Sequence, residues 1–144
     1  MANSIHDNLV RPVQRGEIEY IAEWALPFFV SRHPRIRMSS LYPLLNEALK
    51  NDDCHLVRTD NVVGLFVVEN SPWEPLPTVC DVFVASKKDA SPFEVCRIYN
   101  AGLEWARDKK AIEYRYGTDG LSNLNGVAQR IGYDIVATNY VKRL

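Results

Sequence analysis

A nearly unbroken apolar run at residues 79–85 constrains the fold of this chain more than any other segment. Its sequence is VCDVFVA, with Asp81 as the single charged residue. A strand of that composition is usually central in a sheet and covered on both faces. The start of a helix follows. Ser91 suits the N-cap, Pro92 the first helical position, and Glu94 the third, where a glutamate completes a capping box. We therefore expect a central strand at 79–85 and then a helix that runs to about residue 109.

The residues after this helix complete a strand–helix–strand unit. Residues 112–116 alternate apolar and charged side chains, the pattern of a half-covered strand. Strands joined by a helical crossover run parallel in one sheet. On the other side, residues 55–58 and Val62–Glu69 are separated by the turn signal Thr-Asp-Asn, which predicts a hairpin. We expect Val62–Glu69 to lie beside strand 79–85, and strand 112–116 to run parallel to it.

The flanking segments predict further elements on both sides of this unit. Residues 9–13 suit a short strand, and residues 17–30 an amphipathic helix that Pro27 kinks or ends early. A second helix covers residues 41–49, with Ser39 or Ser40 as its N-cap. A last helix at 124–131 and one or two closing strands at 133–144 follow. Strands mixed with helices in this order predict one α/β domain over residues 1–144, with helices on both faces of a mixed sheet.

Charge and composition exclude several functions. The 144 residues carry 17 basic and 18 acidic side chains, so no positive field favours nucleic acid or an anionic membrane. No apolar run approaches the roughly 20 residues that span a bilayer. The three cysteines, Cys54, Cys80 and Cys96, are odd in number and lack metal-ligand spacing, as do the histidines. We expect free thiols, no metal, and a reducing compartment, most simply the cytoplasm.

Particular residues add a family resemblance to this order of elements. They are the strand at 9–13, the strand at 62–68 with Gly64, the strand at 81–84, and Ala128–Tyr133 followed by Asn139–Lys142. The chain resembles the GNAT superfamily of N-acetyltransferases, in particular short divergent members found in bacteria and tailed phages. The resemblance implies a GNAT-like mixed central sheet of about six or seven strands with helices on both faces. It also implies transfer of an acetyl group from acetyl-CoA to an amine of a small molecule or a protein.

The resemblance places acetyl-CoA along the central strand and the turn after it. The implied contacts are Phe83, Val84, Ala85, Lys88, Ala90 and Ser91. A bulge at Val84 and Ala85 is one way to present backbone amides to the pantetheine arm. In the family, a basic residue and a glycine-rich turn hold the pyrophosphate at a helix N-terminus, where free N–H groups and the helix dipole favour an anion.

This chain departs from that pattern at four positions. Asp89 stands where the motif has arginine or glutamine, and Ala90, Pro92 and Glu94 stand where it has glycines. Proline has no N–H, a capping box occupies further donors, and two carboxylates oppose an anion. The sequence therefore predicts a degenerate pyrophosphate loop that binds acetyl-CoA weakly or not at all. Lys87 and Lys88 either compensate in part or form a solvated surface.

The resemblance also implies an acidic base on the central strands. Asp81 is the best-placed residue and Glu69, at the end of the neighbouring strand, is the second. Burial among apolar residues would favour the neutral carboxyl of Asp81, which suits a base near neutral pH. The alternative is that Asp81 caps a turn or pairs with an arginine. The family's tyrosine acid is replaced by Ala128, and Tyr116 or Tyr133 is either its substitute or a core aromatic.

Two other features leave a choice between a binding surface and ordinary structure. The arginines at 32, 35 and 37 around His33 form either a surface for an acidic partner or a solvated loop. Trp73, in a proline-framed loop, is either an anchor for a protein partner or a lid on the domain's own core. A second function class stays open: a catalytically inactive GNAT-fold binding or structural protein, for example a phage virion component.

Overall fold

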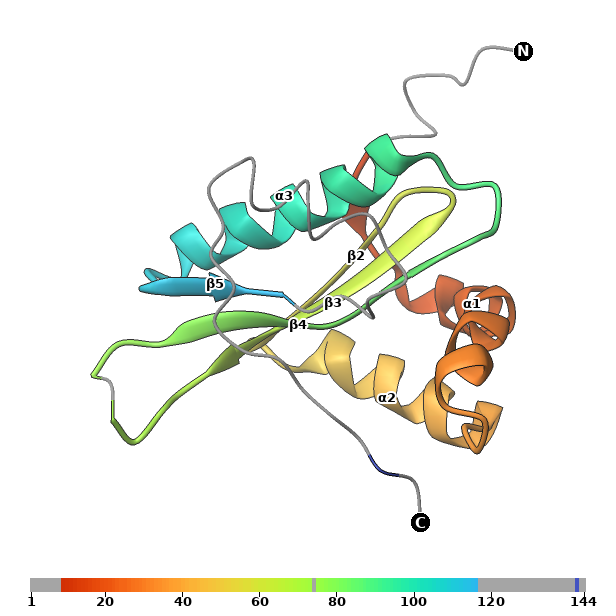
Figure 1. The fold of residues 1–144 in the computed structure, drawn as a ribbon, viewed down its shortest axis with the longest axis horizontal. Helices are drawn as coiled ribbons and strands as arrows, with labels where there is room; N and C mark the ends of the chain where they lie inside the picture. The colour runs from red at the N-terminus through yellow and green to blue at the C-terminus, as the bar shows by residue number, and fades with distance from the viewer. Residues whose placement is uncertain (1–8, 74, 117–141, 143–144) are drawn as a thin grey trace.

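A computed structural model of the chain describes residues 9–73, 75–116 and 142, and it is drawn in Figure 1. Its elements in chain order are β1 (Arg11–Pro12), a 3-10 turn (Arg15–Glu17), α1 (Ile18–Arg32), α2 (Met38–Lys50), β2 (Cys54–Arg58), β3 (Val62–Glu69), β4 (Thr78–Ser86), α3 (Pro92–Asp108) and β5 (Glu113–Arg115). The strands form one sheet in the order β1-β2-β3-β4-β5. Neighbouring strands run antiparallel except for β4 and β5, which are parallel. The predicted place of residues 79–85, beside β3 and parallel to β5, is confirmed.

Two layers of helices cover the two faces of this sheet, as Figure 1 shows. On one face, α1 and α2 bury a core that includes Ile21, Leu41 and Phe83. On the other face, α3 buries a smaller core that includes Phe66 and Ile98. Both Val79 and Ala85 of β4 are fully buried, in agreement with a central strand covered on both faces.

The contact between α3 and the sheet is unusually close at one point. A methyl group placed on Gly102 of α3 would lie 2.5 Å from the ring of Phe66 and 2.6 Å from the hydroxyl of Tyr114. Gly64 of β3 faces the side chain of Ile98 in the same way. The two glycines therefore let the helix and the sheet approach each other more closely than side chains would allow.

Several expectations need correction or lie outside the described residues. The sheet has five strands in the described part of the chain, fewer than the six or seven expected. The helix at 124–131 and the strands at 133–144 lie almost wholly outside the described residues. Pro27 does not end α1, which continues to Arg32, since the helix loses only one backbone hydrogen bond there.

The start of α2 also differs from the prediction. The helix begins at Met38, so its N-cap is Arg37, and neither Ser39 nor Ser40 has that role. No side chain caps this end of the helix. The cysteines Cys54, Cys80 and Cys96 are free thiols, as expected. Among the described helices, none has the length and apolar character needed to cross a bilayer.

Candidate functional site

The edge of β4 that faces β5 is paired along only a third of its length. Thr78, Val79 and Cys80 are opposite residues of β5, and no later residue of β4 pairs with that strand. On its other side, β4 is paired with β3 as far as Ser86. Within the described residues, the backbone groups of β4 that face β5 beyond Cys80 thus have no strand partner. Such groups can bind an extended ligand as a further strand would.

A bulge interrupts β4 where this unpaired edge begins. Leu65 lies opposite Phe83, but the next residue, Phe66, lies opposite Asp81, so Val82 is an extra residue in the strand. The side chain of Val82 is half exposed as a result. The bulge is therefore at Val82, which corrects its suggested place at Val84 and Ala85.

The connection from β4 to α3 has both occupied and unoccupied backbone donors. The N–H of Ala90 donates to the carbonyl of Lys87 (3.1 Å), and that of Glu94 donates to Ser91. Pro92 has no N–H. The remaining N–H groups, those of residues 88, 89, 91 and 93, make no hydrogen bond to the rest of the described chain. The loop thus retains donors for an anion, although fewer than an all-glycine loop would offer.

Glu94 does not have the role expected of it. Ser91 is the N-cap of α3 and accepts a hydrogen bond from the Glu94 N–H (3.3 Å), but the Glu94 side chain does not complete the box. That carboxylate is fully buried and accepts hydrogen bonds from Thr59 (3.1 Å) and Asn61 (3.0 Å), at the turn of the β2–β3 hairpin. The hairpin competes successfully for the carboxylate because it lies directly below the first turn of α3. Glu94 therefore anchors α3 to the sheet and leaves one backbone donor of the cap unused.

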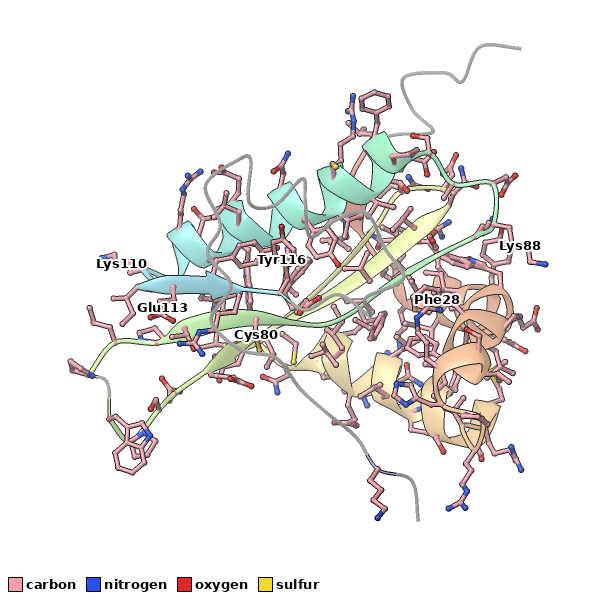
Figure 2. The ribbon with its side chains drawn as sticks, in the orientation of Figure 1. Phe28, Cys80, Lys88, Lys110, Glu113 and Tyr116 are labelled. Carbon is pink, nitrogen blue, oxygen red and sulfur yellow. The ribbon has the colours of Figure 1, made fainter. Side chains whose placement is uncertain are left out.

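The two lysines of the loop are in different environments. Lys87 donates to the hydroxyl of Tyr20 (3.1 Å), and its ammonium lies 5.2 Å from the ring centroid of Trp24, so α1 holds it. The Lys87 N–H also donates to the carbonyl of Asn61 (2.9 Å). Lys88 projects from the loop into solvent, as Figure 2 shows. Only Lys88 is thus placed to meet an anion at the loop, where the exposed Asp89 opposes it.

The structure does not bring the two candidate bases together. Asp81 lies opposite Phe66, a residue of the core beneath α3, whereas Glu69 ends β3 opposite Thr78. Because Cys80 and Asp81 are consecutive in a strand, their side chains point to opposite faces of the sheet. Burial, followed by the effect of the Glu69 carboxylate, raises the pKa of the Cys80 thiol to about 12. Asp81 is half-buried and lies next to the bulge. It directly follows Cys80, the last described residue of β4 that pairs with β5.

The other expected contacts on β4 are mostly core residues. The side chains of Phe83 and Ala85 are buried beneath α1, where the Phe83 ring lies 4.9 Å from that of Phe29. Val84 packs in part against the core beneath α3. Each can therefore reach a ligand chiefly through its backbone. Tyr116 is a packed aromatic, with its ring centroid 4.5 Å from that of Tyr99.

Thr59, Asn61 and Tyr20 are the residues near this site that sequence reasoning missed. No motif marks them, because each acts through a contact with a residue more than 30 positions away. A Thr-Asp-Asn turn predicts only the hairpin. Among the described residues, no group of three potential metal ligands lies together.

Comparisons with known proteins bear on this arrangement through the fold. No family model matches the chain, and no curated protein does. Among solved structures, a transcriptional regulator from Bacillus halodurans matches with a TM-score of 0.78 at 11% identity, over 94% of this chain and 99% of that one.

Two acetyltransferase structures are also similar. An aminoglycoside N-acetyltransferase in complex with CoA gives a TM-score of 0.73 at 12% identity, over 94% of this chain and 93% of that chain. A GNAT family acetyltransferase from Staphylococcus aureus gives 0.68 at 11% identity, over 94% and 98%. Identities this low establish the architecture alone. The chain has the fold of GNAT acetyltransferases.

Proposed function

We propose that this chain is a GNAT-type N-acyltransferase domain that takes an acetyl group from acetyl-CoA and passes it to an amine, with a weakened pyrophosphate loop. One observation carries the proposal. Within the described residues, the parallel strands β4 and β5 are paired only as far as Cys80, and the bulge at Val82 lies just beyond. The unpaired edge of β4 then leads to the N-terminus of α3. An extended thioester with an anionic end matches this sequence of features.

The residues present match acetyl-CoA in part. The unbonded N–H groups of residues 88, 89, 91 and 93 and the ammonium of Lys88 would hold the phosphates. Phe83, Val84 and Ala85 would contribute backbone groups to the pantetheine arm. The hydroxyl of Ser91 and the N–H of Ala90 contribute less than expected, since the Ser91 side chain caps α3 and the N–H of Ala90 is already bonded. Asp89 adds a negative charge beside the phosphates.

Asp81 is the proposed base, and Glu69 is the second candidate. In the transfer, the amine nitrogen forms a bond to the thioester carbonyl carbon and the carbon–sulfur bond breaks. The nitrogen gives its proton to Asp81, directly or through water, and the thiolate of CoA leaves and is protonated. Asp81 suits this role better than Glu69 because it adjoins the bulge, while Glu69 is exposed at the far end of β3. Asp81→Asn is expected to lower kcat about 100-fold or more, and Glu69→Gln is expected to change it much less.

Calorimetry with acetyl-CoA tests the loop. The unmodified chain is expected to bind weakly, and Asp89→Arg combined with Pro92→Gly is expected to bind about tenfold more tightly or better, since it restores a charge and a donor. Glu94 is left intact because it is buried. Asp108→Arg, an equal charge change at the far end of α3, serves as the control.

Each outcome of this titration decides something. Micromolar binding by the unmodified chain would refute the weakened loop and favour an active enzyme. Undetectable binding by both proteins would refute the acyltransferase proposal. That result would favour the alternative of an inactive binding or structural protein, such as a virion component with Trp73 as its partner anchor. Trp73 is 87% exposed, so it is not a lid on the domain's own core.

A further inference from the structure

The turn between α1 and α2 concentrates positive charge. Residues 32–37, called here the basic turn, have the sequence RHPRIR. Three of these six residues are arginines and one is a histidine, while no aspartate or glutamate occurs between residues 24 and 46. His33, Arg35 and Arg37 are all exposed. The turn therefore carries three formal charges without an acidic neighbour in sequence.

Several other cations of the described chain have carboxylate partners. Ion pairs join Arg11 to Asp60, Arg58 to Glu17, Lys50 to Glu47, Arg107 to Glu104 and Arg115 to Glu113. Arg35 and Arg37 have no carboxylate within reach in the part of the chain that the structure describes. Within the described part of the chain, the Arg37 guanidinium donates only to the carbonyl of Ile36 (3.3 Å). Within the described residues, neither charge is thus paired with a carboxylate.

Helix electrostatics explain Arg32 but not Arg37. Arg32 ends α1, where its guanidinium donates to the carbonyl of Phe28 (3.2 Å) and lies 3.7 Å from the centre of the Phe28 ring. A cation is favourable at this position because the C-terminus of a helix is its negative end. Arg37 is the N-cap of α2, where serine, threonine and acidic residues are preferred and the helix dipole repels a cation. The first turn of α2 has no acidic residue to offset this. A local rule broken without structural compensation points to a function.

Two backbone hydrogen bonds brace the basic turn. The N–H of His33 donates to the carbonyl of Phe29 (2.6 Å), and the N–H of Ile36 donates to the carbonyl of His33 (3.0 Å). Pro34 restricts the backbone between them. An ordered turn loses little entropy when a ligand binds, so its exposed guanidinium groups are well prepared for recognition.

The basic turn is remote from the pyrophosphate loop. Tyr20, which holds Lys87 of that loop, is in the first turn of α1, and Arg32 ends this 15-residue helix. At about 1.5 Å per residue, some 18 Å of helix separates them. Binding at the turn and binding of acetyl-CoA can therefore be measured independently.

We infer that the basic turn is a docking surface for an acidic segment of a partner protein. Guanidinium groups form bidentate hydrogen bonds with carboxylates, and arginine is enriched among the residues that dominate protein interfaces. Arg35 and Arg37 would each pair with a carboxylate of an extended acidic peptide. A nucleic acid suits this surface less well. It needs an extended basic track, whereas the net charge of the chain is −1 and the acidic and basic residues outside the turn are mixed.

Fluorescence anisotropy with a short labelled peptide that alternates glutamate and glycine tests the inference. The full chain is expected to bind this peptide at low salt, more weakly as salt rises, and to ignore the same peptide with glutamine in place of glutamate. Arg35→Glu combined with Arg37→Glu is expected to weaken binding about tenfold or more. Arg15→Glu combined with Arg97→Glu, an equal charge change at two exposed positions, is the control and is expected to change it little.

A stability measurement separates this role from a structural one. Arg37→Asp alone is expected to raise Tm by about 2 °C, because an acidic N-cap suits α2, while it weakens peptide binding. A structural role for Arg37 predicts a lower Tm instead. The inference is wrong if the glutamate peptide does not bind, or if the control pair weakens binding as much as the Arg35 and Arg37 pair. Tighter binding of a single-stranded oligonucleotide at the same turn would replace it with a nucleic-acid site.

Discussion

Removal of the Glu94 carboxylate is expected to destabilise the domain much more than removal of an exposed one. In Glu94→Ala, the hydroxyl of Thr59, which is fully buried, loses the acceptor at 3.1 Å, and the amide of Asn61 loses the one at 3.0 Å. A hydrogen bond to a charged group contributes about 1.5–3 kcal/mol, and a buried donor left unpaired costs a similar amount. Part of this loss is offset because Asn61 is half exposed and can reach water. The expected loss is about 3 kcal/mol, or roughly 9 °C in Tm for a domain of this size.

Urea denaturation followed by circular dichroism measures this loss. The control is Glu104→Ala in the same helix, where the side chain is 67% exposed and pairs with Arg107, and the expected change is under about 0.5 kcal/mol. Glu94→Gln keeps the volume and one acceptor but sets an amide against Asn61, so about half of the loss is expected. If Glu94→Ala is as stable as the Glu104 variant, the carboxylate does not anchor α3 and the reasoning fails.

Three further perturbations follow from single contacts. Gly102→Ala places a methyl group 2.5 Å from the Phe66 ring and is expected to lower the stability of the fold by about 2–3 kcal/mol through overpacking. The control Gly16→Ala, whose methyl group would have no atom within 4 Å, should change stability little. Equal stability of the two variants would refute the close packing. Because burial raises the pKa of Cys80 to about 12, its thiolate is scarce at neutral pH, and mass spectrometry should find it alkylated by iodoacetamide far more slowly in the folded than in the unfolded chain. Burial lowers the pKa of His55 below 6.5, so the imidazole binds a proton more readily in the unfolded chain than in the folded one. The free energy of unfolding should therefore fall as pH drops through 6.5. His55→Phe should reduce this pH dependence, and an unchanged pH profile in that variant would contradict the prediction.

The central part of the fold could be predicted because its signals are local. The apolar run in β4, the Ser91 cap and the alternation in β5 each fix one element, and the handedness and direction of a crossover then fix their pairing. The bulge at Val82 could not be predicted in the same way. It depends on the register between β3 and β4, which a single strand's composition does not reveal.

Two errors at helix starts have a common physical origin. Ser91 and Glu94 match a capping box, but the pattern does not reveal that Thr59, 35 positions away, offers the carboxylate a buried partner. Ser39 and Ser40 are good caps, but α2 begins at Met38 before either of them. In both cases a local preference of about 1 kcal/mol is too weak to decide the outcome by itself. For the same reason, the sequence does not reveal which N–H groups at the start of α3 are free to bind a ligand, because that depends on which ones the cap uses.

The strand order also bears on how the chain folds. The β2–β3–β4 meander joins strands that are consecutive in sequence, so its contacts close short loops. Arg11 of β1 and Arg58 of β2 are instead separated along the chain by both α1 and α2. Closing a long loop costs more entropy than closing a short one, and in β1 only two paired residues offset that cost. We expect the meander to form early and β1 to join late and open first. Native-state hydrogen exchange should then be slowest in the central strand β3 and fastest at the β1 edge, and equal protection of the two would contradict this order.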